Sequence, residues 1–454
     1  MKTTVDKILP YVLTPLSWLY GMVMWVRNKL FDWGILSQME YDVPVVGVGN
    51  LTVGGTGKTP HTEYILANLC GQYNVAVLSR GYKRKTKGFI AANSKSTPET
   101  IGDEPWQIYN KFGRRIKVAV CENRRMGITE LLNLYPDLDL IVLDDSFQHR
   151  WVKPKVNILL MEYSRPVYKD HLLPLGRLRE SSHEINRADK VIVTKCPESL
   201  NPIDYRIVTK DLDLMKFQKI YFSRYVYDEL RPVFPDDARF SANLNTLTQK
   251  DSVYLLTGIA HPRYFVLHFK DYPFRKRVEH FSDHHNFSRK DIAKIEQRFR
   301  DMKGERKLII TTEKDAVRLV HNPYFPPELK PFVFFQPIRV EMVAGPHGHD
   351  NDLILDLKQE LRLAVADESQ TSSVIGTQDI IGTMPDSHSH PTASPHDYAD
   401  NSVGIVGGGS SEYSPGIYGG EHDYIRSAEE SPSHRESEPD SYVSEPDEDE
   451  VDIS

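Results

Sequence analysis

Short apolar runs recur along the first two thirds of the chain and alternate with polar segments whose composition suits helices. The runs are rich in Val, Ile and Leu and lack the apolar–polar alternation of a half-exposed strand. Such strands are buried on both faces, as in parallel sheets covered by helices, and a spacing of roughly 20–40 residues suits helical crossovers. The pattern predicts an α/β fold with strands at Val43–Val48, Val75–Ser79, Ile116–Val120, Leu138–Leu143, Val156–Met161, Lys190–Thr194, Ser252–Thr257 and Lys307–Thr311.

A longer apolar segment occupies the N-terminus, where the 19 residues Ile8–Val26 carry no charge. Thr14 is placed to cap a helix whose first residue is Pro15, since proline at that position loses no hydrogen bond. Trp18 and Trp25 are of the type that settles at headgroup depth, and no small-residue cleavage site of a signal peptide follows the run. We expect a helix that lies in the membrane interface; a transmembrane span and a helix packed on the domain are the alternatives.

The apolar pattern ends near residue 366, and Ser, Pro, Gly, His, Asp and Glu dominate the rest. A segment of this composition buries too little apolar surface to offset its ordering entropy, so we expect it to be disordered. The predicted division is a membrane-associated helix over 1–35, an α/β core over 36–200, a second, smaller α/β portion over 201–365 that closes the site, and an acidic tail over 366–454.

The acidic tail hides the charge of the rest of the chain. The net charge is −7, but residues 366–454 hold 20 Asp and Glu against two Arg, which leaves about +11 on residues 1–365. A basic body favours phosphate-bearing ligands or an anionic membrane surface, and nothing in the pattern indicates nucleic acid or an obligate protein partner. The three cysteines, Cys70, Cys121 and Cys196, lack a CxxC spacing, so we expect reduced thiols in a cytosolic chain and no zinc site.

A glycine-rich loop follows the first predicted strand. Its glycines let backbone N–H groups approach phosphate oxygens, Lys58 would neutralise the β and γ phosphates, and the Thr59 hydroxyl would bind Mg²⁺ at the start of the next helix. The usual pattern has glycine where Thr52 stands, so the match is a variant, and a turn that holds no ligand is the alternative. We interpret the segment as the phosphate loop of a phosphate-loop NTPase-type core that binds a nucleoside triphosphate, with the binding residues Thr52, Val53, Gly54, Gly55, Thr56, Gly57, Lys58 and Thr59.

Two carboxylates stand at the end of the strand Leu138–Leu143. Asp144 and Asp145 would be costly at the tip of a buried strand unless a cation or hydrogen-bond donors sat beside them. In phosphate-loop enzymes that cation is Mg²⁺, held by the loop Thr and such an Asp. A capped strand end that leads into a solvated turn is the alternative.

Taken together, these motifs resemble the tetraacyldisaccharide 4'-kinases of lipid A biosynthesis. Seven segments carry the resemblance in chain order and span roughly residues 1–360, and Thr52 is a trait of that family. The segments are Val48–Pro60, Ser79–Tyr82, Gly102–Pro105, Asp144–His149, Leu173–Glu180, Phe281–His285 and Thr312–Asp315.

The resemblance implies a membrane-bound lipid kinase, monotopic or peripheral, on the cytoplasmic face of the inner membrane. It implies transfer of the γ-phosphate of ATP, with Mg²⁺, to the 4'-hydroxyl of a tetraacyldisaccharide 1-phosphate, which gives lipid IV(A). The N-terminal helix would make the membrane contact. The family offers no role for the tail.

The resemblance also implies roles for particular side chains. Asp103 and His284 would together activate the sugar hydroxyl, with Asp283 orienting His284. Arg124 is the candidate for an additional cation, and Glu180 for a further metal-site carboxylate beside Asp144 and Asp145.

Two rival functions remain at this stage. A phosphate-loop kinase or GTPase with a soluble substrate would leave the N-terminal helix without a purpose. The segment Thr194–Pro197 resembles a guanine-recognition element but has Pro197 where that element has Asp. A membrane-tethered nucleotide-binding scaffold would leave Asp103 and His284 without a role.

Overall fold

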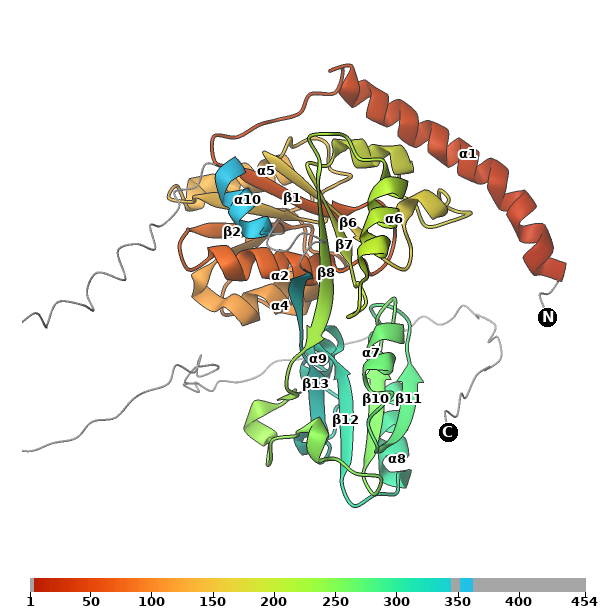
Figure 1. Cartoon of the computed structure of the whole chain (residues 1–454). Helices are drawn as coiled ribbons and strands as arrows, with labels where there is room; N and C mark the ends of the chain where they lie inside the picture. Colours follow the sequence, from red (N-terminus) through yellow and green to blue (C-terminus); the bar gives the residue numbers. More distant parts are fainter. Residues whose placement is uncertain (1–3, 344–351, 362–454) are drawn as a thin grey trace, which may run out of the picture. The chain divides into compact units, whose positions relative to one another are not determined.

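The computed structural model describes residues 4–343 and 352–361 (Figure 1). The chain divides into two compact units, Met1–Gly376 and Thr377–Ser454. The second unit and the predicted tail over 366–454 lie outside the described residues.

The first sheet has nine strands in the order β14-β8-β7-β6-β1-β5-β2-β4-β3. All neighbouring pairs are parallel except those of the edge strands β3 and β14. The predicted α/β fold with a parallel sheet core is therefore confirmed. The strands are β1 (Val45–Asn50), β2 (Val75–Ser79), β3 (Ile90–Ala91), β4 (Lys117–Val120), β5 (Leu140–Asp144), β6 (Val156–Glu162), β7 (Lys190–Thr194), β8 (Lys219–Tyr227) and β14 (Ile338–Val343).

Helices cover both faces of this sheet (Figure 1), which is why its central strands are mostly apolar. One face packs against α2 (Lys58–Leu69), α4 (Asp103–Phe112) and α10 (Leu353–Glu360). The other face packs against α5 (Arg124–Leu134) and α6 (Pro202–Leu212). The short helix α3 (Pro98–Ile101) leads into α4.

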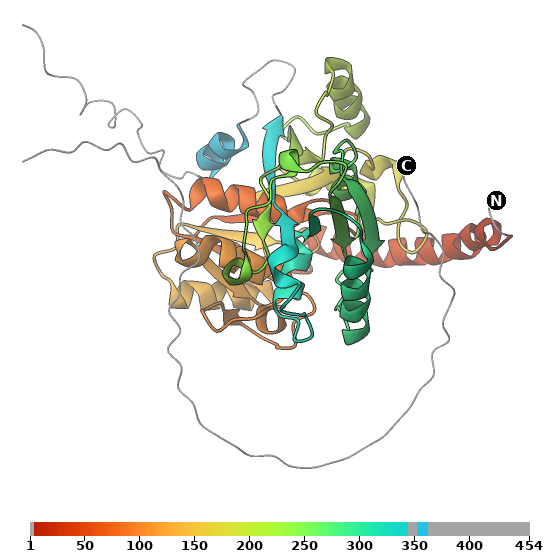
Figure 2. The ribbon, with the colours of Figure 1, turned by 90° about the horizontal axis from the view of Figure 1, so that it is seen from below.

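The second sheet, drawn in green and teal in Figure 2, has five strands in the order β11-β10-β12-β13-β9. It has its own apolar core. The strands are β9 (Arg231–Pro232), β10 (Ser252–Thr257), β11 (Arg275–His280), β12 (Lys307–Thr312) and β13 (Val333–Gln336), and the helices are α7 (Arg263–His268), α8 (Arg289–Asp301) and α9 (Glu313–Val320). Short 3₁₀ helices occupy Gly113–Arg115, Val167–Lys169, Ser182–Arg187, Pro235–Asp237, Leu244–Thr246 and Lys330–Phe332.

The chain enters the second sheet after β8 and returns to the first through β14, and these two strands pair antiparallel. The predicted second portion over 201–365 thus contains elements of both sheets, because β8, β14 and α10 belong with the first. Sequence reasoning missed β8 and β14, since only part of each strand is buried and neither reads as a continuous apolar run.

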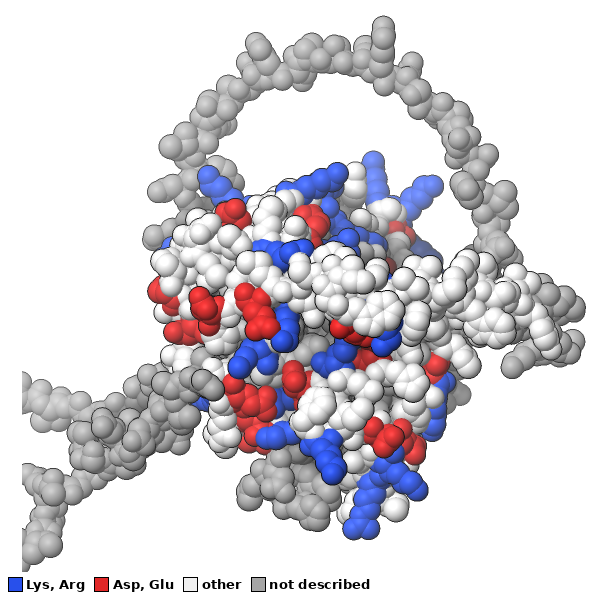
Figure 3. Space-filling view, turned by 90° about the horizontal axis from the view of Figure 1, so that it is seen from above, with Lys and Arg blue, Asp and Glu red and all other residues white. Residues whose placement is uncertain are grey.

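The N-terminal helix α1 (Thr4–Asp32) has two unlike faces. One face is fixed by polar contacts: Ser17 donates to the Leu172 carbonyl at 2.9 Å and Tyr20 donates to the Arg179 carbonyl at 2.7 Å. The opposite face is apolar and exposed, and it includes Trp18 and Trp25. Viewed from above, α1 forms a largely uncharged surface (Figure 3).

The predicted start of this helix at Pro15, capped by Thr14, is wrong, because α1 begins at Thr4. Pro15 removes the hydrogen bond to the Tyr11 carbonyl, but Tyr11 is exposed, so water can satisfy that carbonyl. Within residues 4–343 and 352–361, we find no helix whose length and hydropathy would let it cross a membrane.

Candidate active site

The glycine-rich loop joins the buried strand β1 to the first turn of α2, as the sequence predicts. Gly54 and Gly57 have φ values of 99° and 95°, a region that L side chains rarely adopt. A side chain at Gly57 would also collide with the Tyr225 hydroxyl, and one at Gly54 would lie 3.0 Å from the His261 imidazole. The loop conformation therefore requires glycine at both positions.

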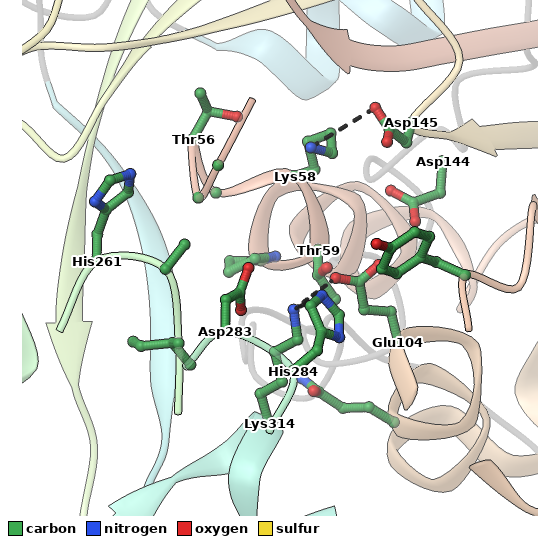
Figure 4. Close-up of a pocket in the computed structure, with 18 of the residues that line it drawn as sticks. Thr56, Lys58, Thr59, Glu104, Asp144, Asp145, His261, Asp283, His284 and Lys314 are labelled. Atoms are coloured by element: carbon green, nitrogen blue, oxygen red, sulfur yellow. Dashed lines mark hydrogen bonds and ion pairs between the residues drawn. The ribbon is translucent and has the colours of Figure 1, made fainter. Parts of the chain in front are cut away.

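Lys58 lies in the first turn of α2 with its ammonium group directed toward an acidic strand end (Figure 4). Its Nζ is 3.6 Å from the Asp145 carboxylate and 3.4 Å from the Asn50 side-chain oxygen. Asn50 in turn donates to the Thr56 hydroxyl at 2.7 Å, which ties the loop to the end of β1. Lys58 is thus held among polar groups and is only partly buried, as a phosphate ligand requires.

The loop forms one wall of a pocket of about 730 Å³, and elements of both sheets form the rest. From the first sheet and its helices come the loop, Glu104 and the two strand-end carboxylates. From the second come the segment after β10, the turn after β11 and the start of α9. Most of the predicted site residues line it: Val53, Gly54, Gly55, Thr56, Gly57, Lys58, Thr59, Asp144, Asp145, Asp283 and His284.

Asp144 and Asp145 have opposite electrostatic environments. Asp144 is buried, and burial together with Glu104 and Asp145 raises its pKa to about 7. The hydroxyls of Thr62 and Ser79 donate to it at 3.3 and 3.4 Å. Burial also raises the pKa of Asp145, but Lys58 and Arg179 outweigh it and hold that pKa below its ordinary value.

Asp103 contacts the pocket residue His284 although 181 positions separate the two. Asp103 is the first residue of α4, and His284 lies in the turn after β11, where its φ of 57° is unusual for a non-glycine residue. The Asp103 carboxylate is 3.4 Å from His284 Nδ1 and accepts from Arg318 Nε and Nη2 at 2.9 and 2.8 Å. Burial raises the pKa of Asp103, but the His284 hydrogen bond and the Arg318 charge bring it down to about 2.

Asp283 does not have the orienting contact that the sequence interpretation gave it. Its side chain is exposed and lines the pocket, but no contact within the described part of the chain joins it to His284. The imidazole instead contacts Asp103, Arg318 and Lys314.

Two further candidates lie behind the pocket wall. Arg124 is buried and donates to the carbonyls of Cys121 and Asp144 at 2.6 and 3.1 Å, so it supports the end of β5. Glu180 is buried in an ion-pair cluster with Arg187 and Arg27 of α1, which fixes the helix to the domain. Neither Arg124 nor Glu180 is among the described residues that line the pocket.

The sequence interpretation assigned no role to three charged residues that complete this site. Arg318 binds Asp103, Lys314 binds Glu104 and His284, and Arg179 binds Asp145. Lys314 and Arg179 fall within motifs that carried the family resemblance, and Arg318 follows Lys314 by one helical turn. Membership of these motifs was the signal for Lys314 and Arg179, and the spacing of one helical turn was the signal for Arg318.

No group of three or more His, Cys, Asp and Glu side chains in the described ranges is arranged to hold a metal by itself. The donors beside the loop are the Thr59 hydroxyl and the carboxylates of Asp144 and Asp145. Mg²⁺ usually takes one or two carboxylates and completes its shell with water and substrate phosphates. The oxygen donors present, with Asp144 crowded by two other carboxylates, fit such an ion.

Known proteins are similar to this chain over most of its length. A family model described as tetraacyldisaccharide-1-P 4'-kinase matches residues 9–356. A tetraacyldisaccharide 4'-kinase of Bacteroides thetaiotaomicron is 49% identical over 355 residues, covering 77% of this chain and 93% of the relative. Its counterpart in Flavobacterium johnsoniae is 40% identical over 354 residues, covering 78% and 99%.

A solved structure gives the same result at the level of the fold. It is described as an "apo" form of LpxK from Aquifex aeolicus in complex with ATP, and it is 29% identical with a TM-score of 0.57. The match covers 78% of this chain and 98% of that chain. The resemblance inferred from the motifs is confirmed, and the chain belongs to the tetraacyldisaccharide 4'-kinase family.

Proposed function

We propose that this protein transfers the γ-phosphate of ATP to the 4'-hydroxyl of a tetraacyldisaccharide 1-phosphate and so makes lipid IV(A) in lipid A biosynthesis. The observation that carries the proposal is a single pocket lined by a phosphate loop, an acidic strand end and His284, which Asp103 contacts from behind. Membership of the family supplies the acceptor class. A scaffold that only binds nucleotide would leave the Asp–His pair without a purpose.

In the proposed reaction, the sugar hydroxyl gives its proton to His284 as its oxygen bonds to the γ-phosphorus. The bond from that phosphorus to the bridging oxygen breaks, and ADP leaves. Asp103 stays ionised at neutral pH because its pKa is about 2, so it orients the imidazole and does not itself take the proton. Lys58 and the loop N–H groups stabilise the charge of the phosphates.

For the metal we propose Mg²⁺, held by Thr59, Asp144 and Asp145 together with the phosphates. When bound, the ion would neutralise charge on the phosphate oxygens. Arg124, through the Asp144 carbonyl, would keep the strand end in place.

We further propose that α1 holds the protein on an anionic membrane surface, as a monotopic or peripheral protein on the cytoplasmic face of the inner membrane. Support comes from the exposed apolar face of α1 and from the net positive charge of residues 1–365. A lipid acceptor would then meet the pocket from the membrane.

The proposal is tested with [γ-³²P]ATP, purified tetraacyldisaccharide 1-phosphate and thin-layer chromatography. The parent protein should transfer label to the lipid, and the variant Lys58→Ala should not. Label released only as free phosphate, or transferred only to a soluble acceptor, would contradict the proposed acceptor.

A further inference from the structure

The imidazole of His284 has a second charged partner besides Asp103. Lys314, the second residue of α9, places its Nζ 2.9 Å from His284 Nε2 and 3.0 Å from the Glu104 carboxylate. We propose that Lys314 is a further catalytic residue, which holds His284 ready as a base and then donates to the phosphoryl group in transit. This inference rests on the proposed phosphoryl transfer.

The first step concerns the tautomer of His284. An ammonium group has donors only, so the short contact from Lys314 requires His284 Nε2 to be the acceptor. The ring hydrogen must then be on Nδ1, which faces the Asp103 carboxylate at 3.4 Å. Arg318 Nη2 also lies 3.1 Å from Nδ1, but a neutral imidazole accepts at only one of its two nitrogens. Because Arg318 Nη2 already donates to the Asp103 carboxylate at 2.8 Å, the shorter Lys314 contact is the one that the ring accepts. Lys314 therefore selects the tautomer whose Nε2 lone pair can take a proton from a hydroxyl.

The second step concerns position. A hydroxyl that gives its proton to His284 must lie within hydrogen-bond distance of Nε2, which is where the Lys314 ammonium now lies. The acceptor hydroxyl must therefore displace this one contact. The ammonium stays beside it, because Glu104 holds it through an independent ion pair. The displaced N–H is then within reach of the atoms that react.

The third step concerns charge. Glu104 is next to Asp103 in α4. Burial raises the pKa of Glu104, but the charges of Lys314 and Lys58 outweigh burial and hold that pKa below its ordinary value. The same carboxylate is thus close to the loop lysine and to Lys314, and both lysines line one pocket. The negative charge of a transferring phosphoryl group is spread over its equatorial oxygens. Lys314 can donate one N–H to these oxygens and keep another on Glu104.

These contacts combine into one balanced step. The hydroxyl proton moves to His284 Nε2, the new oxygen–phosphorus bond forms, and the bond to the ADP oxygen breaks. Lys314 loses no proton. The N–H that donated to His284 Nε2 donates to a phosphoryl oxygen instead. Its contribution is therefore larger in the transition state than in the bound ground state.

The test compares binding of Mg–ADP with trapping of Mg–ADP–aluminium fluoride, which mimics the transferring group. In Lys314→Ala, we expect ADP affinity within about threefold of the parent, whereas trapping and kcat each fall at least about 100-fold. Lys314→Arg, which keeps a cation, should recover part of both. The matched control is Lys290→Ala, which removes an exposed lysine at the start of α8 and should change neither.

Two results would overturn the proposal. One is trapping by Lys314→Ala as tight as that of the parent. The other is a loss of melting temperature and ADP affinity in proportion to the loss of trapping, which would make Lys314 a structural partner of Glu104. Trapping needs no lipid, because water can take the place of the acceptor hydroxyl beside His284 Nε2. A parent that traps the complex but fails to phosphorylate the disaccharide would therefore contradict the proposed acceptor alone.

Discussion

The exposed face of α1 gives the most quantitative prediction about membrane binding. Trp18 and Trp25 lie two helical turns apart on this face and are 73% and 57% exposed. Replacing both by serine removes apolar surface without touching the contacts of Ser17, Tyr20, and Arg27 with the domain. We therefore expect the Trp18→Ser/Trp25→Ser variant to keep its melting temperature and to lose affinity for lipid.

The magnitude follows from the exposed area. A tryptophan buries up to about 250 Å², so the two rings expose about 320 Å², worth about 8 kcal/mol at roughly 25 cal/mol per Å² if fully buried. A helix in the interface buries only part of each ring. If half of the exposed area is buried, the two rings contribute about 4 kcal/mol to membrane binding. The double variant should therefore bind vesicles roughly 100- to 1000-fold more weakly.

The assay is co-sedimentation with vesicles that contain anionic lipid. Phe217→Ser is the matched control, because Phe217 is 61% exposed but lies outside α1. Its affinity for vesicles should match that of the parent. If the double tryptophan variant co-sediments as well as this control, the exposed face does not bind the membrane.

Three other predictions concern the pocket. Lys58→Ala should abolish turnover with little change in melting temperature, because the ammonium contacts pocket groups and not the core; retained activity in a folded variant would contradict the phosphate-loop assignment. Asp103→Asn should lower the free energy of unfolding by about 1–2 kcal/mol at pH 7. The pKa of Asp103 in the folded protein is about 2, below its ordinary 3.8, so the stability that this carboxylate contributes is complete above about pH 5 and is lost as the pH falls toward 2. If urea titrations at pH 2 give the same difference in free energy of unfolding between the parent and Asp103→Asn as at pH 7, the ion pair is refuted. Asp103→Ala and His284→Ala should each lower kcat by about 10²–10⁴-fold, and the double variant should be hardly worse than either; losses that multiply would show that the two act independently.

The sequence was sufficient where the relevant forces are local. Continuous apolar runs such as Leu138–Leu143 predicted strands buried on both faces, and the glycines of the loop marked a turn that only glycine can form. The strands β8 and β14 were missed because only part of each is buried and they pair across more than 100 residues.

Side-chain partners were harder to predict than elements. The ion pair between Asp103 and Arg318 joins residues 215 positions apart, so no periodic pattern in the sequence predicts it. Likewise, the ion pairs of Glu180 with Arg27 and Arg187 depend on how α1 packs, so they could not be predicted from the sequence. The Asp103–His284 pair was predicted only because both residues belong to motifs of a known family.

The most direct test of the central claim is the position of the phosphate in the lipid product. The purified protein, ATP, Mg²⁺ and tetraacyldisaccharide 1-phosphate are incubated together, and the product is examined by mass spectrometry and by proton–phosphorus correlation NMR. We predict a gain of one phosphate and two phosphorus signals, one correlated with the anomeric proton and one with the proton at the 4' position. A phosphate at another hydroxyl, or unchanged lipid beside hydrolysed ATP, would contradict the proposed function.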